Sequence, residues 1–269
     1  TNLSNTSVKN EVRRYTKIDT DTWTVEGNND KIQGTGVVYV SSSGNDATGE
    51  VGNILKPFSS LTTAITTLFS NNTAFEIVII STGTFTTSTS LRSLVKPLII
   101  SSNFAVVLNI NSLGENMYFP ITFNIPKGDL IFSQSIKQPF GSTSFFNIRA
   151  KNITQNTGSQ LTEGGFNIEA EKITLNSSYL VAGVIHKSIL KVGVLKFVGV
   201  GGFFQTYSGW SVEAELELLI DNIEHDSTFG LTLGNKTRLI IGNIYGTYTG
   251  GHFYFASFVA GVIDSYVLF

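Results

Sequence analysis

A six-residue phrase recurs through the second half of the chain, with apolar residues at its first, third and sixth positions. Positions four and five often hold turn-favouring residues, as in Lys151-Asn152 and Asp221-Asn222. Successive sixth positions are 20, 24, 26, 21 and 19 residues apart. The copies run from Ile148 to Ile153, Ile168 to Ile173, Val192 to Phe197, Leu218 to Ile223, Leu239 to Ile244 and Phe258 to Ile263. A repeat of this length, built on short β-prone phrases, predicts the coils of a solenoid.

The phrase describes a strand, a corner and the first inward residue of the next strand. Positions one and three fall on the same face of an extended strand. A single coil cannot bury its own apolar face, whereas coils stacked at about 4.8 Å share one continuous core. We therefore expect an all-β protein that forms a right-handed parallel β-helix. An antiparallel β-sandwich or barrel is the alternative for a chain this rich in Ile, Val and Phe.

Residues 1–36 differ from the rest of the chain and are predicted to form an extended N-terminal attachment segment. Leu3, Val8, Val12 and Tyr15 have the spacing of a weak helical stripe, and a polar linker follows from Asp19 to Gly36. Such a segment buries little by itself, so we expect it to pack on a neighbouring protein. The chain as a whole is expected to be a processed or trimmed part of something longer.

The β-helix domain is predicted to span residues 37–269 and to open with the β-rich run Val37–Val40. Ser59 or Ser60 can cap a short helix that closes the end of the solenoid. The apolar face of this helix comprises Leu61, Ala64, Ile65 and Leu68. A buried strand from Glu76 to Ile80 then leads into a turn.

The order "YVSSSGNDATG", "KPFSSLTTAI" and "EIVIISTGTF" resembles the opening of pectate-lyase-like parallel β-helix proteins. The resemblance covers Val37 to Phe85, about a fifth of the chain. It implies a strand, a Gly-Asn-Asp loop, a Pro-Phe step and a capping helix before the first coil. Openings of this kind are frequent in bacteriophage tailspikes, tail fibres and head fibres. They also occur in bacterial surface proteins and polysaccharide-degrading enzymes, and the resemblance does not choose among these classes.

Composition excludes several classes of function. Hydrophobic residues make up 41% and charged residues 14% of the chain, which is too apolar for disorder. A net charge of -2 does not indicate the basic surface that binds nucleic acid. No apolar run approaches the roughly 18 residues that a membrane span requires, and the absence of cysteine rules out disulfides and thiolate sites. We therefore expect no nucleic-acid partner and no membrane insertion.

The residues do not form a recognisable catalytic constellation. A polysaccharide hydrolase needs paired carboxylates, and the Asn-Thr-Asp, Asp-Asp, His-Gly and Arg-Ile-Lys phrases of polygalacturonase-like β-helices are absent. His186 and His252 lack metal-ligand spacing with a second donor. The densest acidic group comprises Glu213, Glu215, Glu217, Asp221, Glu224 and Asp226, with His225 among them. Alternation places the first three on one outward face. There they either contact a cation or a partner or form a solvated sheet surface, and we favour the solvated surface. We predict no catalytic residue, metal or cofactor.

The leading interpretation is a structural virion protein of a bacteriophage, a tail or head fibre or spike subunit on the particle surface. It would serve assembly and attachment to host-surface polysaccharide without catalysis. We expect a homotrimer that binds other virion proteins through the N-terminal segment. The candidate glycan-binding residues are Tyr207, Trp210, Tyr245 and Tyr248. Two alternatives remain: a polysaccharide depolymerase, acting as a lyase or glycoside hydrolase on the same scaffold, and a bacterial surface adhesin.

Overall fold

The structure is a computed structural model. It describes residues 3–6, 12–19, 22–26, 36–89, 91, 96–111, 119–135, 145–156, 160–161, 165–182, 188–199, 201–205, 215–226, 229–233, 237–246, 252–255 and 266–268. No helix in these ranges is long and apolar enough to cross a membrane.

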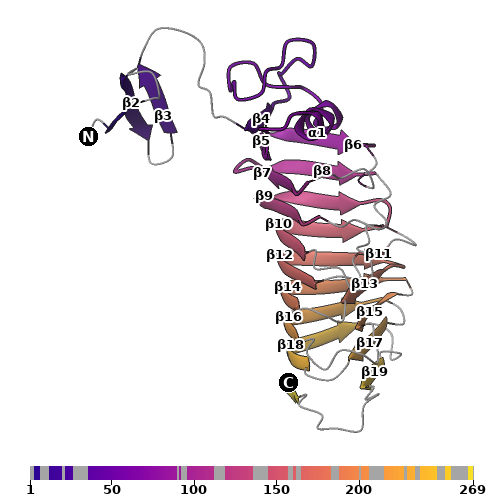
Figure 1. Ribbon diagram of the computed structural model, residues 1–269. Helices are drawn as coiled ribbons and strands as arrows, with labels where there is room; N and C mark the ends of the chain where they lie inside the picture. The colour runs from indigo at the N-terminus through magenta and orange to yellow at the C-terminus, as the bar shows by residue number, and fades with distance from the viewer. Residues whose placement is uncertain are drawn as a thin grey trace.

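The largest sheet has 12 parallel strands and runs along the molecule (Figure 1). The predicted parallel β-solenoid with one short helix is confirmed. The main path through the sheet is β4 (Val37–Val40), β5 (Glu76–Ile79), β7 (Leu98–Ser101), β9 (Ile121–Phe132), β10 (Phe145–Gln155), β12 (Gly165–Asn176), β14 (Ser188–Val198), β16 (Leu216–His225), β18 (Thr237–Gly246) and β20 (Tyr266–Leu268). Two further strands, β6 (Gly83–Thr87) and β8 (Val106–Ile110), join the sheet through β9.

The long strands from β9 to β18 each bend at a corner, which divides them into a first arm and a second arm. In β10 the buried positions are Phe146, Ile148 and Ala150 before the corner and Ile153 and Gln155 after it. The alternation therefore skips one residue, as the six-residue phrase predicts. In β9 the corner is longer and contains Pro126, opposite which the pairing register shifts.

Stacked apolar rows build the core. The first-arm row consists of Val38, Ile77, Ile100, Phe123, Ile148, Ile168, Leu190, Leu218 and Leu239, all buried. The second-arm row consists of Phe85, Leu108, Leu130, Ile153, Ile173, Leu195, Ile223 and Ile244. Every member of the second row is buried except Ile244, which is 40% exposed.

The pairing register corrects the predicted position of the phrase in β14 and the predicted partner of Leu239. Ile168 pairs with Leu190 and not with Val192, so the copy in β14 starts two residues earlier than predicted. The corner explains the shift: a Cβ at Gly193 would lie 2.8 Å from the carbonyl oxygen of Glu171, so glycine suits this corner. At the C-terminal end, Leu239 pairs with Val267. The predicted copy from Phe258 to Ile263 lies outside the described residues.

A smaller five-stranded parallel sheet forms another side of the later coils (Figure 1). It contains β11 (Gln160–Leu161), β13 (Tyr179–Ala182), β15 (Gly201–Gln205), β17 (Phe229–Leu233) and β19 (His252–Phe255). Because each of these short strands follows a long strand in the chain, one coil contributes to both sheets.

The end of the solenoid near β4 is capped as predicted. Helix α1 (Leu61–Ser70) starts at the N-cap Ser60, whose hydroxyl oxygen accepts a hydrogen bond from the backbone N–H of Thr63. Its buried residues are Leu61, Ala64, Ile65 and Leu68. The backbone of Phe58 bonds to Tyr39 and Ser41, so the preceding loop covers the outer edge of β4. A covered edge removes a template for strand addition.

The N-terminal segment contains strands and not the predicted helical stripe. β1 (Leu3–Thr6), β2 (Val12–Asp19) and β3 (Thr22–Glu26) form a three-stranded antiparallel meander. β2 and β3 are rich in β-branched and aromatic residues, which favour strands over helices. The predicted β-helix domain starts at Val37, which is the first residue of β4.

Candidate functional site

The outward face of the second arms carries two rows of mostly polar side chains. One row on it comprises Thr86, Asn109, Ile131, Thr154, Thr174, Lys196, Glu224 and Tyr245. The adjacent row comprises Asp129, Asn152, Lys172, Val194, Asn222 and Asn243. We call these two rows together the second-arm face.

Side-chain contacts between neighbouring coils hold this face in place. The amide of Asn152 donates to the carboxylate of Asp129 at 2.7 Å. Nearer the C-terminus, the side-chain amide of Asn243 donates to the side-chain oxygen Oδ1 of Asn222 at 3.1 Å. Apart from Ile131 and Val194, the side chains of the two rows can each donate or accept a hydrogen bond.

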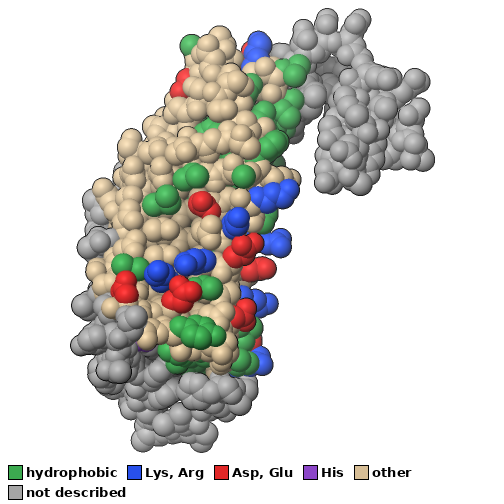
Figure 2. All heavy atoms as spheres, turned by 180° about the vertical axis from the view of Figure 1, so that it is seen from behind, with side chains coloured by type: hydrophobic (Ala, Val, Ile, Leu, Met, Phe, Trp, Pro, Cys, Tyr) green, Lys and Arg blue, Asp and Glu red, His purple; other side chains and the backbone are tan. Residues whose placement is uncertain are grey.

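Charges of both signs lie on the C-terminal half of the second-arm face. Lys172 Nζ lies 3.6 Å from Glu224 Oε2, and Lys196 is in register with Glu224. The side chains of Lys172 and Glu224 are 38% and 40% exposed, so solvent screens this ion pair. Figure 2 shows basic and acidic side chains interspersed over the lower half of the molecule rather than in a patch of one sign.

Tyr245 is the predicted glycan-binding residue that the structure describes. It lies on β18 at the C-terminal end of the second-arm face, in register with Glu224, and is 56% exposed. An exposed tyrosine ring offers an apolar surface and a hydroxyl group side by side, which suits the face of a sugar ring. Tyr207, Trp210 and Tyr248 lie outside the described residues.

The acidic group of β16 is divided between separate surfaces. Glu217 lies on the first arm and accepts a hydrogen bond from Arg238 at 2.6 Å, whereas Glu224 lies on the second arm. Asp226 accepts the backbone N–H of Gly199 at 3.1 Å, and Asp221 lies at the corner. Glu215 is exposed just before β16, and Glu213 falls outside the described residues. Among the described residues, no group of three or more His, Cys, Asp or Glu could hold a metal ion.

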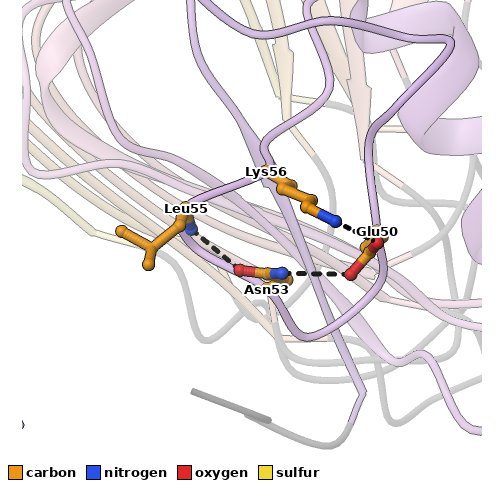
Figure 3. A network of polar contacts seen from close by, with 4 residues as sticks. All are labelled: Glu50, Asn53, Leu55 and Lys56. Carbon is orange, nitrogen blue, oxygen red and sulfur yellow. Dashed lines mark hydrogen bonds and ion pairs between the residues drawn. The ribbon is translucent and has the colours of Figure 1, made fainter. Parts of the chain in front are cut away.

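The loop after β4 carries a second polar network, which has a structural role. The carboxylate of Glu50 accepts hydrogen bonds from Asn53 Nδ2 at 3.0 Å and Lys56 Nζ at 2.6 Å (Figure 3). The side-chain oxygen of Asn53 in turn accepts the backbone N–H of Leu55 at 3.1 Å. These contacts lie within one loop, so they fix its shape.

The Gly-Asn-Asp sequence of this loop also has a structural explanation. Asp46 accepts hydrogen bonds from the backbone N–H groups of Ser59 and Ser60 and from the hydroxyl of Thr63. Burial alone would raise the pKa of Asp46, but these hydrogen bonds outweigh it and the pKa is lowered. A Cβ at Gly44 would overlap the carbonyl oxygen of Phe58, so only glycine fits there.

Sequence reasoning missed most of the second-arm face, although a signal for it exists. In the row that contains Thr154 and Glu224, each residue comes directly after the sixth position of a phrase. Thr154 follows Ile153, and Glu224 follows Ile223. The misplaced copy in β14 hid Lys196, which follows Leu195 once the corner is set at Gly193.

Fold and surface together define a β-solenoid protein with a polar outward ladder. No family model, curated protein or solved structure matches the chain.

Proposed function

We propose that this chain is a non-catalytic fibre or spike subunit of a bacteriophage, which binds host-surface polysaccharide through the second-arm face. The observation that carries the proposal is the polar row from Thr154 to Tyr245, which runs along the solenoid and ends in an exposed aromatic ring. The resemblance of residues 37–85 to the opening of tailspike and fibre β-helices supports the phage setting.

The spacing of the row suits a long polysaccharide. Successive strands contribute one side chain each at about 4.8 Å, which is close to the length of one pyranose unit in an extended glycan. A glycan that lies along the solenoid could therefore meet hydroxyl, ammonium and carboxylate groups in turn, with Tyr245 stacked on a sugar face. Many such contacts, each weak alone, give affinity for a polymer.

The assembly we propose is a homotrimer on the surface of the virion, attached to other virion proteins through residues 1–36. A solenoid that projects from a particle gains stiffness when three copies pack side by side. Sedimentation equilibrium of the purified chain should give three times the monomer mass of 29.2 kDa. A monomer at micromolar concentration would contradict this part of the proposal.

Binding tests the function directly. We expect the protein to co-sediment with capsular or cell-wall polysaccharide from its host and Tyr245→Ala to weaken that binding at least several-fold. The matched control is Phe104→Ala, because Phe104 is also exposed, at 44%, but lies in the loop between β7 and β8. Equal binding by Tyr245→Ala and Phe104→Ala would show that the second-arm face does not bind the polysaccharide.

A further inference from the structure

The apolar row inside the second arms is open at its last member. Its members from Phe85 to Ile223 are at most 4% exposed, whereas Ile244 is 40% exposed. Ile244 pairs with Ile223 on one side. Its neighbours in β18, residues 242–243 and 245–246, are exposed as well. The core row is therefore covered by a neighbouring coil at Ile223 and lacks such a cover at Ile244.

The backbone edge of the same arm is also open. β20 pairs with β18 at Arg238, Leu239 and Ile240, which belong to the first arm. Among the strands that the structure describes, none pairs with residues 243–246 on the side away from β16. Such an edge presents unpaired backbone N–H and C=O groups, which are a template for a further strand.

The opposite end of the main sheet is protected (Figure 1). The backbone N–H of Phe58 donates to the carbonyl oxygen of Tyr39 at 2.8 Å, and that of Gly52 donates to Val37 at 2.7 Å. Helix α1 also packs on β4, β5 and β6. Proteins cover exposed strand edges because open edges pair with other chains. An edge that is open at one end alone, beside an open apolar row, therefore indicates a docking site.

The described strands at this end form a step that is one strand high. β20 extends the first arm by one strand beyond β18, whereas the second arm stops at β18. Paired strands lie about 4.8 Å apart, so the step matches the thickness of one extended segment. The β4 end of a second copy does not match it, because a loop and α1 cover the edge strand there.

The strand on the other side of this arm shows what kind of segment fits. In β16, Ile223 is in register with Ile244 and Glu224 is in register with Tyr245. The same alternation on the open side requires an apolar residue beside Ile244 and a polar residue beside Tyr245. A parallel direction continues the coils, since β16 and β18 are themselves parallel.

We propose that residues 243–246 dock one extended segment of a partner protein, which adds to β18 as a parallel strand. The segment places an apolar side chain against Ile244 and so closes the core row. This contact joins the partner to the end of the solenoid opposite α1. It uses the edge of β18, whereas glycan binding uses the outward second-arm face, so either proposal can fail alone.

Disulfide trapping on the full chain tests the docking site, because the chain has no cysteine of its own. Tyr245→Cys places a thiol beside the open edge. The probe is a synthetic peptide that copies residues 221–226 with Glu224→Cys, since Glu224 has the register of Tyr245. Residues paired on adjacent strands have the Cα separation that a disulfide requires.

Under thiol exchange, we expect mass spectrometry to show several-fold more peptide adduct on Tyr245→Cys than on Thr174→Cys. Thr174→Cys is the matched control, because Thr174 lies in the same outward row but on β12, which is paired on both sides. Reaction with cystamine, a small disulfide that cannot pair as a strand, corrects for the accessibility of each thiol. Ile244→Asp in the chain, or Ile223→Asp in the peptide, should lower the adduct several-fold because either change removes the apolar contact.

Three results would overturn the proposal. Equal corrected adduct on Tyr245→Cys and Thr174→Cys would show that the edge captures no strand. Adduct that is unchanged by Ile223→Asp in the peptide would show that the apolar contact does not hold the segment, and this test leaves the folded chain unaltered. A disulfide-linked dimer of Tyr245→Cys that forms in preference to the peptide adduct would assign the edge to a second copy. Circular dichroism of each chain variant separates these outcomes from loss of the fold.

Discussion

The carboxylate of Asp46 accepts a hydrogen bond from the hydroxyl of Thr63 at 2.9 Å, across 17 residues of chain. The same carboxylate accepts the backbone N–H groups of Ser59 at 2.8 Å and Ser60 at 2.9 Å. One side chain thus joins the loop after β4 to the first turn of α1, where an anion also interacts favourably with the helix dipole. We therefore expect this contact to stabilise the cap of the solenoid.

Replacement of Asp46 by Asn should lower the free energy of unfolding by about 1.5–3 kcal/mol, since hydrogen bonds to a charged acceptor are worth this much. The effect should also depend on pH. Because the folded-state pKa is lowered, the carboxylate stabilises the fold fully above its unfolded-state pKa and loses this contribution as pH falls through the folded-state pKa.

Urea unfolding of the parent and Asp46→Asn across the acid range measures this dependence. The difference between the two proteins should shrink as the pH decreases. Asp221→Asn is the control, because Asp221 is exposed at a corner. A difference that stays constant with pH would show that the carboxylate charge does not stabilise the cap.

Substitution of Gly193 by Ala should destabilise the solenoid by about 1–3 kcal/mol, the usual cost of an added methyl group in a packed site. The new Cβ would lie 2.8 Å from the carbonyl oxygen of Glu171 in the coil above. Gly230→Ala is a matched control, since a Cβ there meets nothing within 4 Å. Thermal unfolding of both variants gives the comparison, and equal melting temperatures would contradict the register assigned to β14.

Lys96 joins the C-terminal end of α1 to the next coil. Its ammonium group donates to the carbonyl oxygens of Asn71 at 2.7 Å and Ala74 at 2.6 Å. Lys96→Met keeps most of the apolar stem but removes both hydrogen bonds, so we expect a loss of about 1.5–3 kcal/mol. Lys191→Met, at an exposed outward position, should change stability by less than about 0.5 kcal/mol. Hydrogen exchange of α1 should rise in Lys96→Met alone.

The parts of the fold that follow from local rules could be predicted from the sequence. The strand–corner period of the six-residue phrase predicts four of its copies in the register that the structure shows. The apolar stripe of Leu61, Ala64, Ile65 and Leu68 predicts the buried face of α1. Val192 and Leu190 are both apolar, so periodicity cannot choose between them. The choice depends on how closely Gly193 approaches the backbone of the coil above, which is a tertiary contact.

The N-terminal meander and the second-arm face were harder to predict for different reasons. Leu3, Val12 and Tyr15 fit a helical spacing, but pairing among β1, β2 and β3 decides their conformation, and pairing is not a local property. On the second-arm face, Lys172 and Glu224 are 52 residues apart and meet because the coils stack. No spacing rule within one coil could bring them together.

Product analysis on bound polysaccharide tests most directly whether this solenoid binds glycan without cleaving it. The purified protein is incubated with a polysaccharide that it co-sediments with, and new reducing ends and unsaturated sugars are measured over time. We predict that neither accumulates above the protein-free control. Product formation that is abolished by Glu224→Gln or Asp226→Asn would show that the protein is a depolymerase and contradict the proposed function.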